Sequence, residues 1–360
     1  MAKKILVVDD SALMRRVICD IINSDERFQV TGRAVDGLQA FDLLSRHSYD
    51  AVVLDVNMPR MTGLELLKEL RKYRIPARVM MASTDTREGA KTTLDALELG
   101  ALDFIHKPDN AAQCREGSFP DHLLRILDAV SGSSVSVLET EPAKSRESAQ
   151  TTSKVVELVK KSPSRTAGSK VVAIASSTGG PKALQSVIPK LPAQLDAPVL
   201  LVQHMPKGFT ASLAERLNEL SEITVKEAAE GDELQKGVVY VSTGGMHMNV
   251  VYTGGRHVVH YTDEPHREGV KPCANYMYES LSESRYDKVV CVGLTGMGAD
   301  GTEGIKNLES SKKIHVITQD QASCVVYGMP RSVVNAGIPA QVVPLEQIAQ
   351  EVILGVGVRS

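Results

Sequence analysis

Short apolar runs rich in β-branched residues alternate with amphipathic stretches along most of this 360-residue chain. In the first part, the predicted strands cover residues 5–8, 29–34, 51–55, 78–82 and 103–107. The predicted helices that follow them cover residues 12–23, 37–47, 63–72, 86–99 and 119–129. This alternation predicts a parallel sheet with helices on both faces. Such folds bind ligands at the carboxyl ends of their strands.

A second alternation of the same kind occupies the last part of the chain. Its predicted strands cover residues 171–176, 198–204, 288–294 and 313–318. Residues 223–263 instead alternate apolar and polar side chains between Gly-Asp and Gly-Gly turn signals, so we expect antiparallel hairpins at one edge. The fold class is therefore α/β, with two doubly wound parallel-sheet domains.

A Ser/Thr-rich stretch separates the two alternations. Residues 131–169 contain fourteen Ser or Thr in thirty-nine positions and no aromatic residue, a composition that cannot form a core alone. We therefore predict a first domain over 1–128, a flexible linker over 129–169 and a second domain over 170–360. The apolar patch at 155–159 has two further interpretations, a helical turn and a docking point, although its composition favours plain linker.

Charge, hydropathy and cysteine spacing exclude several classes of protein. The net charge is −3, and neither domain has the basic surplus typical of a nucleic-acid-binding surface. No run of eighteen apolar residues exists, and the start MAKKILVVDDS is unlike a signal peptide. The five cysteines are widely spaced without a C-x-x-C pair, which argues against a disulfide framework and a zinc knuckle. We expect a cytoplasmic protein without membrane insertion.

Polar residues end several strands of the first predicted sheet. Asp9 and Asp10 close the first strand, Asp55 closes the third, Ser83 follows the fourth and Lys107 closes the fifth. Converging carboxylates suit Mg²⁺, and beside such an ion one carboxylate can act as a nucleophile toward a phosphoryl group. Taken singly, each of these residues is more typical of a solvated loop start.

The motifs LVVDDS, LDVNMPRMTG, MAST and HKP, in this order, resemble the receiver domain of bacterial response regulators over residues 3–128. The resemblance implies a flavodoxin-like fold in which Asp55 accepts a phosphoryl group. It also implies that Ser83 and Lys107 bind the phosphoryl oxygens. The implied Mg²⁺ site consists of Asp10, Asp55, Asp9 through water, and the backbone carbonyl of Asn57. The family's aromatic switch position falls near Phe104, Ile105 and His106, where the sequence assigns no switch.

A serine-rich turn follows the first strand of the second sheet. The segment VVAIASSTGGPKAL ends in Ser176, Ser177 and Thr178, turns on two glycines, and enters a helix through Pro181. A serine there projects from the sheet edge beside free helix amides, a geometry that suits an attacking hydroxyl or a bound anion. A helix cap is the more common role of such a serine.

The next strand ends in His204, and the strand at 288–294 leads into a turn that carries Asp300. A serine nucleophile needs an imidazole base, and the imidazole needs a carboxylate that fixes its tautomer. We therefore expect Ser177, His204 and Asp300 to meet at one edge. A lone histidine is nevertheless often structural, and an Asp in a glycine-rich turn is often only a turn residue.

The same glycine-rich turn permits a second interpretation. Gly296, Gly298 and Gly301 spell G-x-G-x-x-G, and Asp320 lies nineteen residues beyond the last glycine. This is formally the dinucleotide-binding fingerprint, so a nucleotide-dependent oxidoreductase is the alternative. A response regulator without catalytic activity is another. The fingerprint leaves the serine-rich and histidine segments unexplained, and it normally lies on the first strand of its domain.

The combination of ASSTGGP, VQHMPKGFTASLAERL, GGMHM and LTGMGADGTEG resembles the catalytic domain of the CheB protein-glutamate methylesterases over about 170–355. The resemblance implies a Rossmann-like domain with Ser177 as nucleophile, His204 as base and later acid, and Asp300 as the group orienting His204. Ser176 stands where the family usually has Ala, so it must be excluded as nucleophile. The backbone amide near Met297 is an oxyanion candidate.

These resemblances together imply a phosphorylation-regulated hydrolase that removes methyl esters from chemoreceptor glutamates and also deamidates glutamines. The implied partners are methyl-accepting chemotaxis receptors and a chemotaxis histidine kinase, without nucleic acid. They also imply Mg²⁺ in the receiver and no cofactor for the esterase. They further imply that the receiver packs over the esterase cleft and that phosphorylation of Asp55 loosens or repositions it.

Overall fold

The computed structural model describes the chain except for residues 84–86, 109–113, 115–118, 134–167 and 360. The chain divides into two compact units, Met1–Pro142 and Ala143–Ser360. The last helix of the first unit ends at Gly132, and the first strand of the second begins at Lys170. The predicted linker over 129–169, including the patch at 155–159, falls mostly outside the described residues.

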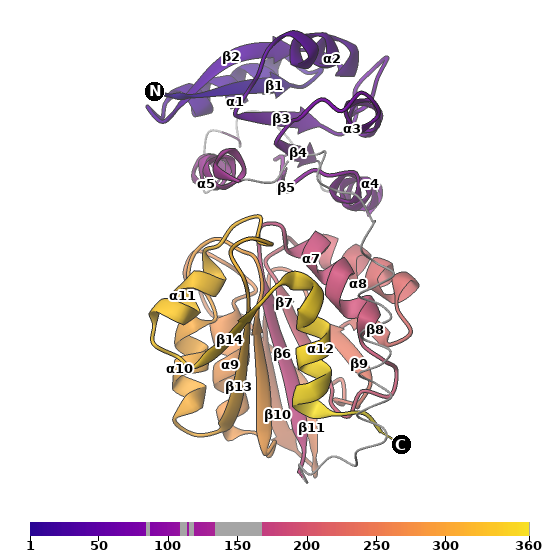
Figure 1. Ribbon diagram of the computed structural model, residues 1–360, viewed down its shortest axis with the longest axis vertical. Coiled ribbons are helices and arrows are strands. Elements are labelled where there is room, and N and C mark those ends of the chain that lie inside the picture. The colour runs from indigo at the N-terminus through magenta and orange to yellow at the C-terminus, as the bar shows by residue number, and fades with distance from the viewer. Residues whose placement is uncertain (84–86, 109–113, 115–118, 134–167, 360) are drawn as a thin grey trace. The chain divides into compact units, whose positions relative to one another are not determined.

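The first unit is a five-stranded parallel sheet in the order β2-β1-β3-β4-β5, as the sequence predicts (Figure 1). Its strands are β1 (Lys3–Val8), β2 (Phe28–Ala34), β3 (Ala51–Asp55), β4 (Val79–Ser83) and β5 (Asp103–His106). Its helices are α1 (Ala12–Asn23), α2 (Gly37–Arg46), α3 (Gly63–Lys72), α4 (Arg87–Glu98) and α5 (Phe119–Gly132). Helices α1 and α5 pack together on one face, and α2, α3 and α4 follow one another on the other.

The second unit is a seven-stranded parallel sheet in the order β14-β13-β12-β6-β7-β9-β8. Its strands are β6 (Lys170–Ser176), β7 (Val199–Gln203), β8 (Thr224–Glu227), β9 (Val238–Val241), β12 (Lys288–Gly293), β13 (Lys313–Gln319) and β14 (Ala340–Val343). Its α-helices are α7 (Gly180–Val187), α8 (Phe209–Leu220), α9 (Ala274–Ser280), α10 (Thr302–Glu309), α11 (Met329–Asn335) and α12 (Leu345–Val356). Helices α7, α8 and α12 pack on one face, and α9, α10 and α11 on the other (Figure 1).

The segment 223–263 differs in part from its prediction as antiparallel hairpins. Strands β8 and β9 pair in parallel with each other, and β9 pairs in parallel with β7, so both extend the main sheet. Only β10 (His247–Thr253) and β11 (Arg256–Thr262) form an antiparallel hairpin, and they make a separate two-stranded sheet. The turn between them is Gly254-Gly255, with φ of 59° and 86°, values that favour glycine in a two-residue hairpin turn.

The centre of the second sheet is buried on both faces because its strands consist almost entirely of apolar residues. All residues of β6 and β7 are buried. Strand β6 lies between β7 and β12, so the chain leaves β6 toward one side of the sheet and later returns on the other. This reversal is a topological switch point, where the loops after adjacent strands diverge and leave room for a ligand.

The five cysteines are free thiols and all are buried. Among the described residues, no helix has both the length and the apolar character needed to cross a bilayer.

Candidate active site

The turn after β6 presents Ser177 at the carboxyl edge of the second sheet. Ser177 is partly exposed, and its backbone N–H donates to Thr295 O at 3.0 Å, which ties it to the loop after β12. Gly179 follows with φ of 76°, and a side chain there would meet Val325 at 2.6 Å. Helix α7 then begins at Gly180, with Pro181 in its first turn. Gly179, Gly180 and Pro181 therefore turn the chain sharply just after Ser177.

Burial distinguishes the two neighbouring serines. Ser176 has no exposed surface, and its hydroxyl donates to Gln203 Oε1 at 2.7 Å. The Gln203 amide group donates in turn to Ser177 O and to His204 O, at 3.0 and 3.2 Å. Ser176 thus links the ends of β6 and β7. Within the described residues, the Ser177 hydroxyl has no recorded hydrogen bond, so it is the one available for chemistry.

His204 and Asp300 form a nearly buried pair next to this turn. His204 Nε2 lies 2.7 Å from Asp300 Oδ2, and the two side chains are 10% and 2% exposed. The His204 backbone N–H donates to Ser176 O at 3.1 Å, which fixes the start of its loop against β6. Because an Nε2–H donates to the carboxylate, the neutral imidazole keeps its lone pair on Nδ1. Nδ1 of His204 is therefore the atom of this pair that can accept a proton.

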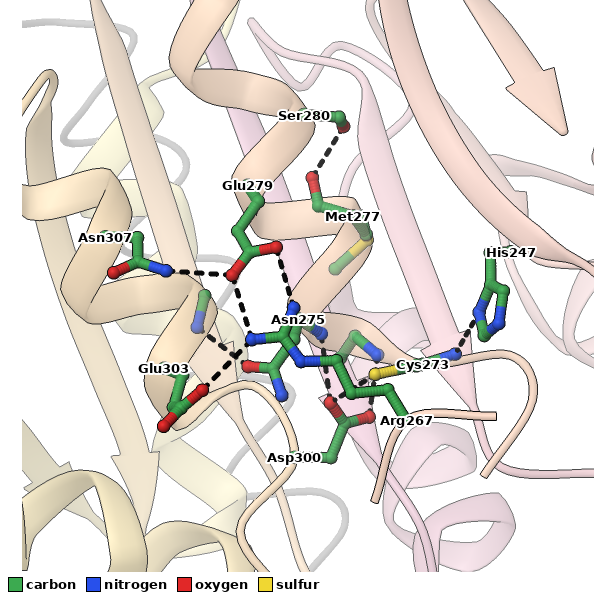
Figure 2. Close-up of polar contacts among 12 residues, drawn as sticks. His247, Arg267, Cys273, Asn275, Met277, Glu279, Ser280, Asp300, Glu303 and Asn307 are labelled. Carbon is green, nitrogen blue, oxygen red and sulfur yellow. Dashed lines mark hydrogen bonds and ion pairs between the residues drawn. The ribbon is translucent and has the colours of Figure 1, made fainter. Parts of the chain in front are cut away.

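The Asp300 carboxylate is held by donors from the start of α9 (Figure 2). Oδ2 accepts the Ala274 N–H at 2.6 Å, and Oδ1 accepts the Asn275 N–H at 2.9 Å and the Cys273 thiol at 3.0 Å. Burial alone would raise the pKa of Asp300, but its bonds to His204, Cys273 and Ala274 outweigh that effect and lower it to about 2. Asp300 is therefore an anion at neutral pH.

The loop after β12 packs directly against the turn that carries Ser177. A side chain at Gly296 would meet Ser177 Cβ at 2.8 Å, so only glycine permits this approach. Gly296 O accepts the backbone N–H groups of Gly328 and Met329, at 3.0 and 2.8 Å. The next residue is Met297, and its backbone N–H has no recorded partner in the described part of the chain. An unpaired amide beside the serine is what an oxyanion donor requires.

Thr295 is a structural residue of this site that the sequence analysis missed. Its hydroxyl donates to Thr178 O at 3.0 Å and accepts the Val326 N–H at 3.0 Å. Its backbone N–H donates to Gln319 Oε1 at 2.8 Å. Thr295 therefore connects three loops at the sheet edge, and these long-range bonds leave no local pattern in the sequence.

The hydrogen bonds of the glycine-rich turn oppose its interpretation as a dinucleotide site. Asn275 Oδ1 accepts the N–H groups of Gly301 and Gly304, at 3.1 and 2.7 Å, so the start of α10 is already capped. Asp320 accepts the backbone N–H and hydroxyl of Ser323, at 3.0 and 2.5 Å, as a turn residue does. Two amides at the start of α10 and the carboxylate of Asp320 are thus engaged within the protein.

The structure therefore brings His204 and Asp300 into contact and places Ser177 at the adjacent strand end. Ser177 and His204 share no recorded hydrogen bond, although such bonds often tighten only when substrate binds. An accessible hydroxyl, an oriented imidazole, a buried carboxylate and a free amide are the elements of acyl transfer.

The carboxyl edge of the first sheet holds the acidic cluster. One ligand oxygen from each of Asp9, Asp10 and Asp55 lies within 4.8 Å of the others. Lys107 Nζ lies 2.7 Å from Asp55 and 3.1 Å from Asp9. Burial raises the pKa of Asp55 despite the nearby ammonium, and Asp55 and Asp9 raise the pKa of Lys107 despite its burial. Three carboxylates facing one point fit a hard divalent cation.

The other predicted receiver residues lie around this cluster. Ser83 is buried at the end of β4, and its hydroxyl donates to Gly89 O at 3.4 Å. Asn57 is exposed two residues beyond β3. Phe104 and Ile105 are buried on β5, and His106 is partly exposed, with no hydrogen-bond partner for its Nδ1 among the described residues. The aromatic switch stays unassigned.

Two family models match the chain in the order of its two units. The response regulator receiver domain matches residues 5–116, and the CheB methylesterase model matches residues 172–352.

Full-length relatives and a solved domain agree with these matches. The protein-glutamate methylesterase/protein-glutamine glutaminase of Pyrococcus abyssi is 41% identical over 354 residues, covering 98% of this chain and 93% of that protein. The protein of the same name from Geobacillus kaustophilus is 39% identical, covering 98% of this chain and 99% of its own length. The Thermotoga maritima CheB methylesterase catalytic domain has a TM-score of 0.51 at 39% identity, covering 52% of this chain and 99% of that one.

A serine-directed fluorophosphonate tests which hydroxyl is reactive. We expect peptide mass spectrometry of the labelled full chain to place the adduct on Ser177, because Ser176 is buried and bonded to Gln203. Ser177→Ala should abolish labelling, whereas the matched variant Ser176→Ala should keep it. An adduct on Ser176 in the wild-type chain would contradict this assignment.

Acid unfolding tests whether the hydrogen bonds to Asp300 lower its pKa in the folded chain. Its pKa is about 2 in the folded chain and near 3.9 when unfolded, so the carboxylate stabilises the fold above about pH 4. That contribution is lost as the pH falls toward 2. Between pH 5 and pH 2, Asp300→Asn should therefore lose about 2 kcal/mol less free energy of unfolding than wild type, measured by urea titration. Equal losses in both chains would refute the depressed pKa.

Proposed function

The chain belongs to the CheB methylesterase family and carries a receiver domain before its esterase domain, and we propose that Ser177, His204 and Asp300 perform its hydrolysis. The proposed substrates are methyl esters of glutamate side chains in methyl-accepting chemotaxis receptors. The observation that carries the proposal is the His204–Asp300 contact of 2.7 Å beside the turn that presents Ser177. The relatives named above carry both activities in their names, methylesterase and glutaminase.

In the first step, Ser177 Oγ attacks the ester carbonyl carbon and its proton passes to His204 Nδ1. The tetrahedral intermediate places negative charge on the former carbonyl oxygen, and the Met297 N–H is the proposed hydrogen-bond donor to that oxygen. The carbon–oxygen bond to the methoxy group then breaks, and His204 returns the proton to that oxygen as methanol leaves. The product is an ester between Ser177 and the glutamyl group.

In the second step, a water molecule attacks the acyl-serine while His204 again takes the proton. The bond to Ser177 breaks and the serine regains its proton from His204. The glutamic acid product loses its own proton to solvent and leaves as the carboxylate. Asp300 keeps its charge throughout, because its role is to orient the imidazole and stabilise the imidazolium.

The same residues serve a glutaminase reaction, in which ammonia leaves instead of methanol. Ammonia leaves only when its nitrogen is more fully protonated than a leaving methoxy oxygen, so this reaction depends more strongly on proton donation by His204. We therefore expect the ester to be cleaved faster than the amide at equal substrate concentration.

For the receiver, we propose that Asp55 accepts a phosphoryl group from a chemotaxis histidine kinase. Asp9, Asp10, Asp55 and the Asn57 carbonyl would hold Mg²⁺, which when bound supplies positive charge to the transferring oxygens. Lys107 contributes a second cation 2.7 Å from Asp55, and Ser83 is the hydroxyl proposed to bind a phosphoryl oxygen. Phosphorylation changes the charge at this edge and so regulates the esterase.

Methanol release from methylated receptor tests the catalytic assignment. Ser177→Ala and His204→Ala should each lower kcat by at least roughly 10³-fold, and Asp300→Asn by roughly 10²-fold or more. The matched control Ser176→Ala should stay within a few-fold of wild type, because its hydroxyl only links two strands. Wild-type turnover by folded Ser177→Ala would refute the proposal.

Phosphorylation of the receiver should raise methanol release several-fold. A small phosphodonor such as acetyl phosphate with Mg²⁺ should activate wild type but not Asp55→Asn, and a chain lacking residues 1–150 should be active without it. Activation of Asp55→Asn equal to that of wild type would place the regulatory site elsewhere. Unchanged rates in every case would refute regulation by the receiver.

A further inference from the structure

Helices α9 and α10 cap each other through residues next to the active site (Figure 2). Asp300, two residues before α10, accepts the first two N–H groups of α9, from Ala274 and Asn275. Asn275, in the first turn of α9, accepts the N–H groups of Gly301 and Gly304 at the start of α10. Two N–H groups at the start of each helix thus have a side-chain acceptor from the other segment, which fixes the backbone on both sides of Asp300.

Cys273 stands at the N-cap position of α9 but does not cap that helix. Ser, Thr, Asp and Asn are the usual residues there, and their side chains accept helix amides. Here Asp300 takes those amides, and the Cys273 thiol donates to Asp300 Oδ1 at 3.0 Å. Burial and the Asp300 charge raise the pKa of Cys273, so the sulfur keeps the proton that it donates.

The backbone of Cys273 is itself held from the hairpin. Its N–H donates to His247 Nδ1 at 3.2 Å, and His247 Nε2 lies 3.3 Å from Pro265 O. His247 is the fully buried first residue of β10. Because Nδ1 accepts and Nε2 donates, the ring is a neutral tautomer with both nitrogens satisfied. Nothing in the proposed hydrolysis uses His247, so this chain of bonds is supporting structure that ends at Asp300.

We propose that Cys273 is a positioning residue of the hydrolysis: its thiol holds Asp300 Oδ1 so that Oδ2 faces His204. The inference rests on the proposed roles of Asp300 and His204. Each carboxylate oxygen has two donors, and the Cys273 thiol is the side-chain donor on Oδ1. Without it, Oδ1 keeps only the Asn275 amide, and the carboxylate gains freedom to turn away from the imidazole.

Loss of the thiol also leaves more negative charge on Asp300. Asp300 interacts electrostatically with His204, Cys273 and Tyr278, and Arg267 interacts with Cys273. Of these groups, His204 is the one that gains a positive charge during the proposed hydrolysis. An Asp300 carboxylate with more negative charge stabilises the protonated form of His204 relative to its neutral form. The acid limb of the kcat/KM profile should therefore move, an effect that a cysteine serving only to fill space would not produce.

The experiment compares full-length Cys273→Val, which lacks the donor at similar volume, with Cys273→Ser, which keeps a donor. Cys291→Val is the matched control, because Cys291 is a fully buried cysteine in β12 with no hydrogen bond recorded among the described residues. Methanol release gives kcat and KM across pH. Proton NMR of chains with ¹⁵N-labelled histidine follows the imidazole N–H between His204 and Asp300, assigned by its loss in His204→Gln.

Cys273→Val should lower kcat about tenfold with little change in KM, in keeping with the loss of one hydrogen bond to a charged group. Its acid limb and its imidazole N–H resonance should shift, whereas Cys273→Ser and Cys291→Val should stay close to wild type. If Cys273→Val has the rate, pH profile and resonance of Cys291→Val, the positioning role is wrong. Cys273→Ala provides the same comparison if the valine does not fold.

The two proposals fail in different ways. If wild type releases no methanol from methylated receptor, the proposed function is wrong, and the NMR comparison still tests whether Cys273 holds Asp300. If wild type is active and the Cys273 variants are unaltered in all three readouts, the function stands and the positioning role falls.

Discussion

The buried Asp300 carboxylate is the charge on which the catalytic half of this molecule depends. A carboxylate without hydrogen-bond donors in so buried a site would be neutral, because burial destabilises the anion. Four donors, from His204, Cys273, Ala274 and Asn275, keep Asp300 ionised instead. A fixed anion then orients the imidazole, and the imidazole can accept a proton on its other nitrogen. In the proposed mechanism, the reactivity of Ser177 thus depends on hydrogen bonds from residues that are distant from it in sequence.

Parallel-sheet topology explains how residues far apart in sequence reach this carboxylate. The loops after β6, β7 and β12 carry Ser177, His204 and Asp300, and these three strands are neighbours in the sheet. The receiver uses the same rule, since Asp9 and Lys107 follow β1 and β5, and Asp55 is the last residue of β3. In both units the sheet supplies a rigid base, and the loops supply the chemistry.

Much of this arrangement could be predicted from the sequence, because apolar periodicity specifies buried parallel strands and the polar residues that end them share an edge. The direction of β8 and β9 could not, since alternating patterns look alike in parallel and antiparallel edge strands. Strand β14 was missed because it is short and half-exposed. The contacts of Cys273, Asn275 and Thr295 are long-range, so only the folded chain reveals which serine is buried and which donors surround Asp300.

Trapping of the acyl-enzyme tests the central claim most directly. Rapid acid quench of the full chain turning over a methylated receptor peptide, followed by mass spectrometry, measures where the acyl group resides. The account predicts a covalent glutamyl ester on the peptide that contains Ser177, formed as methanol appears and lost as carboxylate appears. An acyl group carried by any other residue would contradict it.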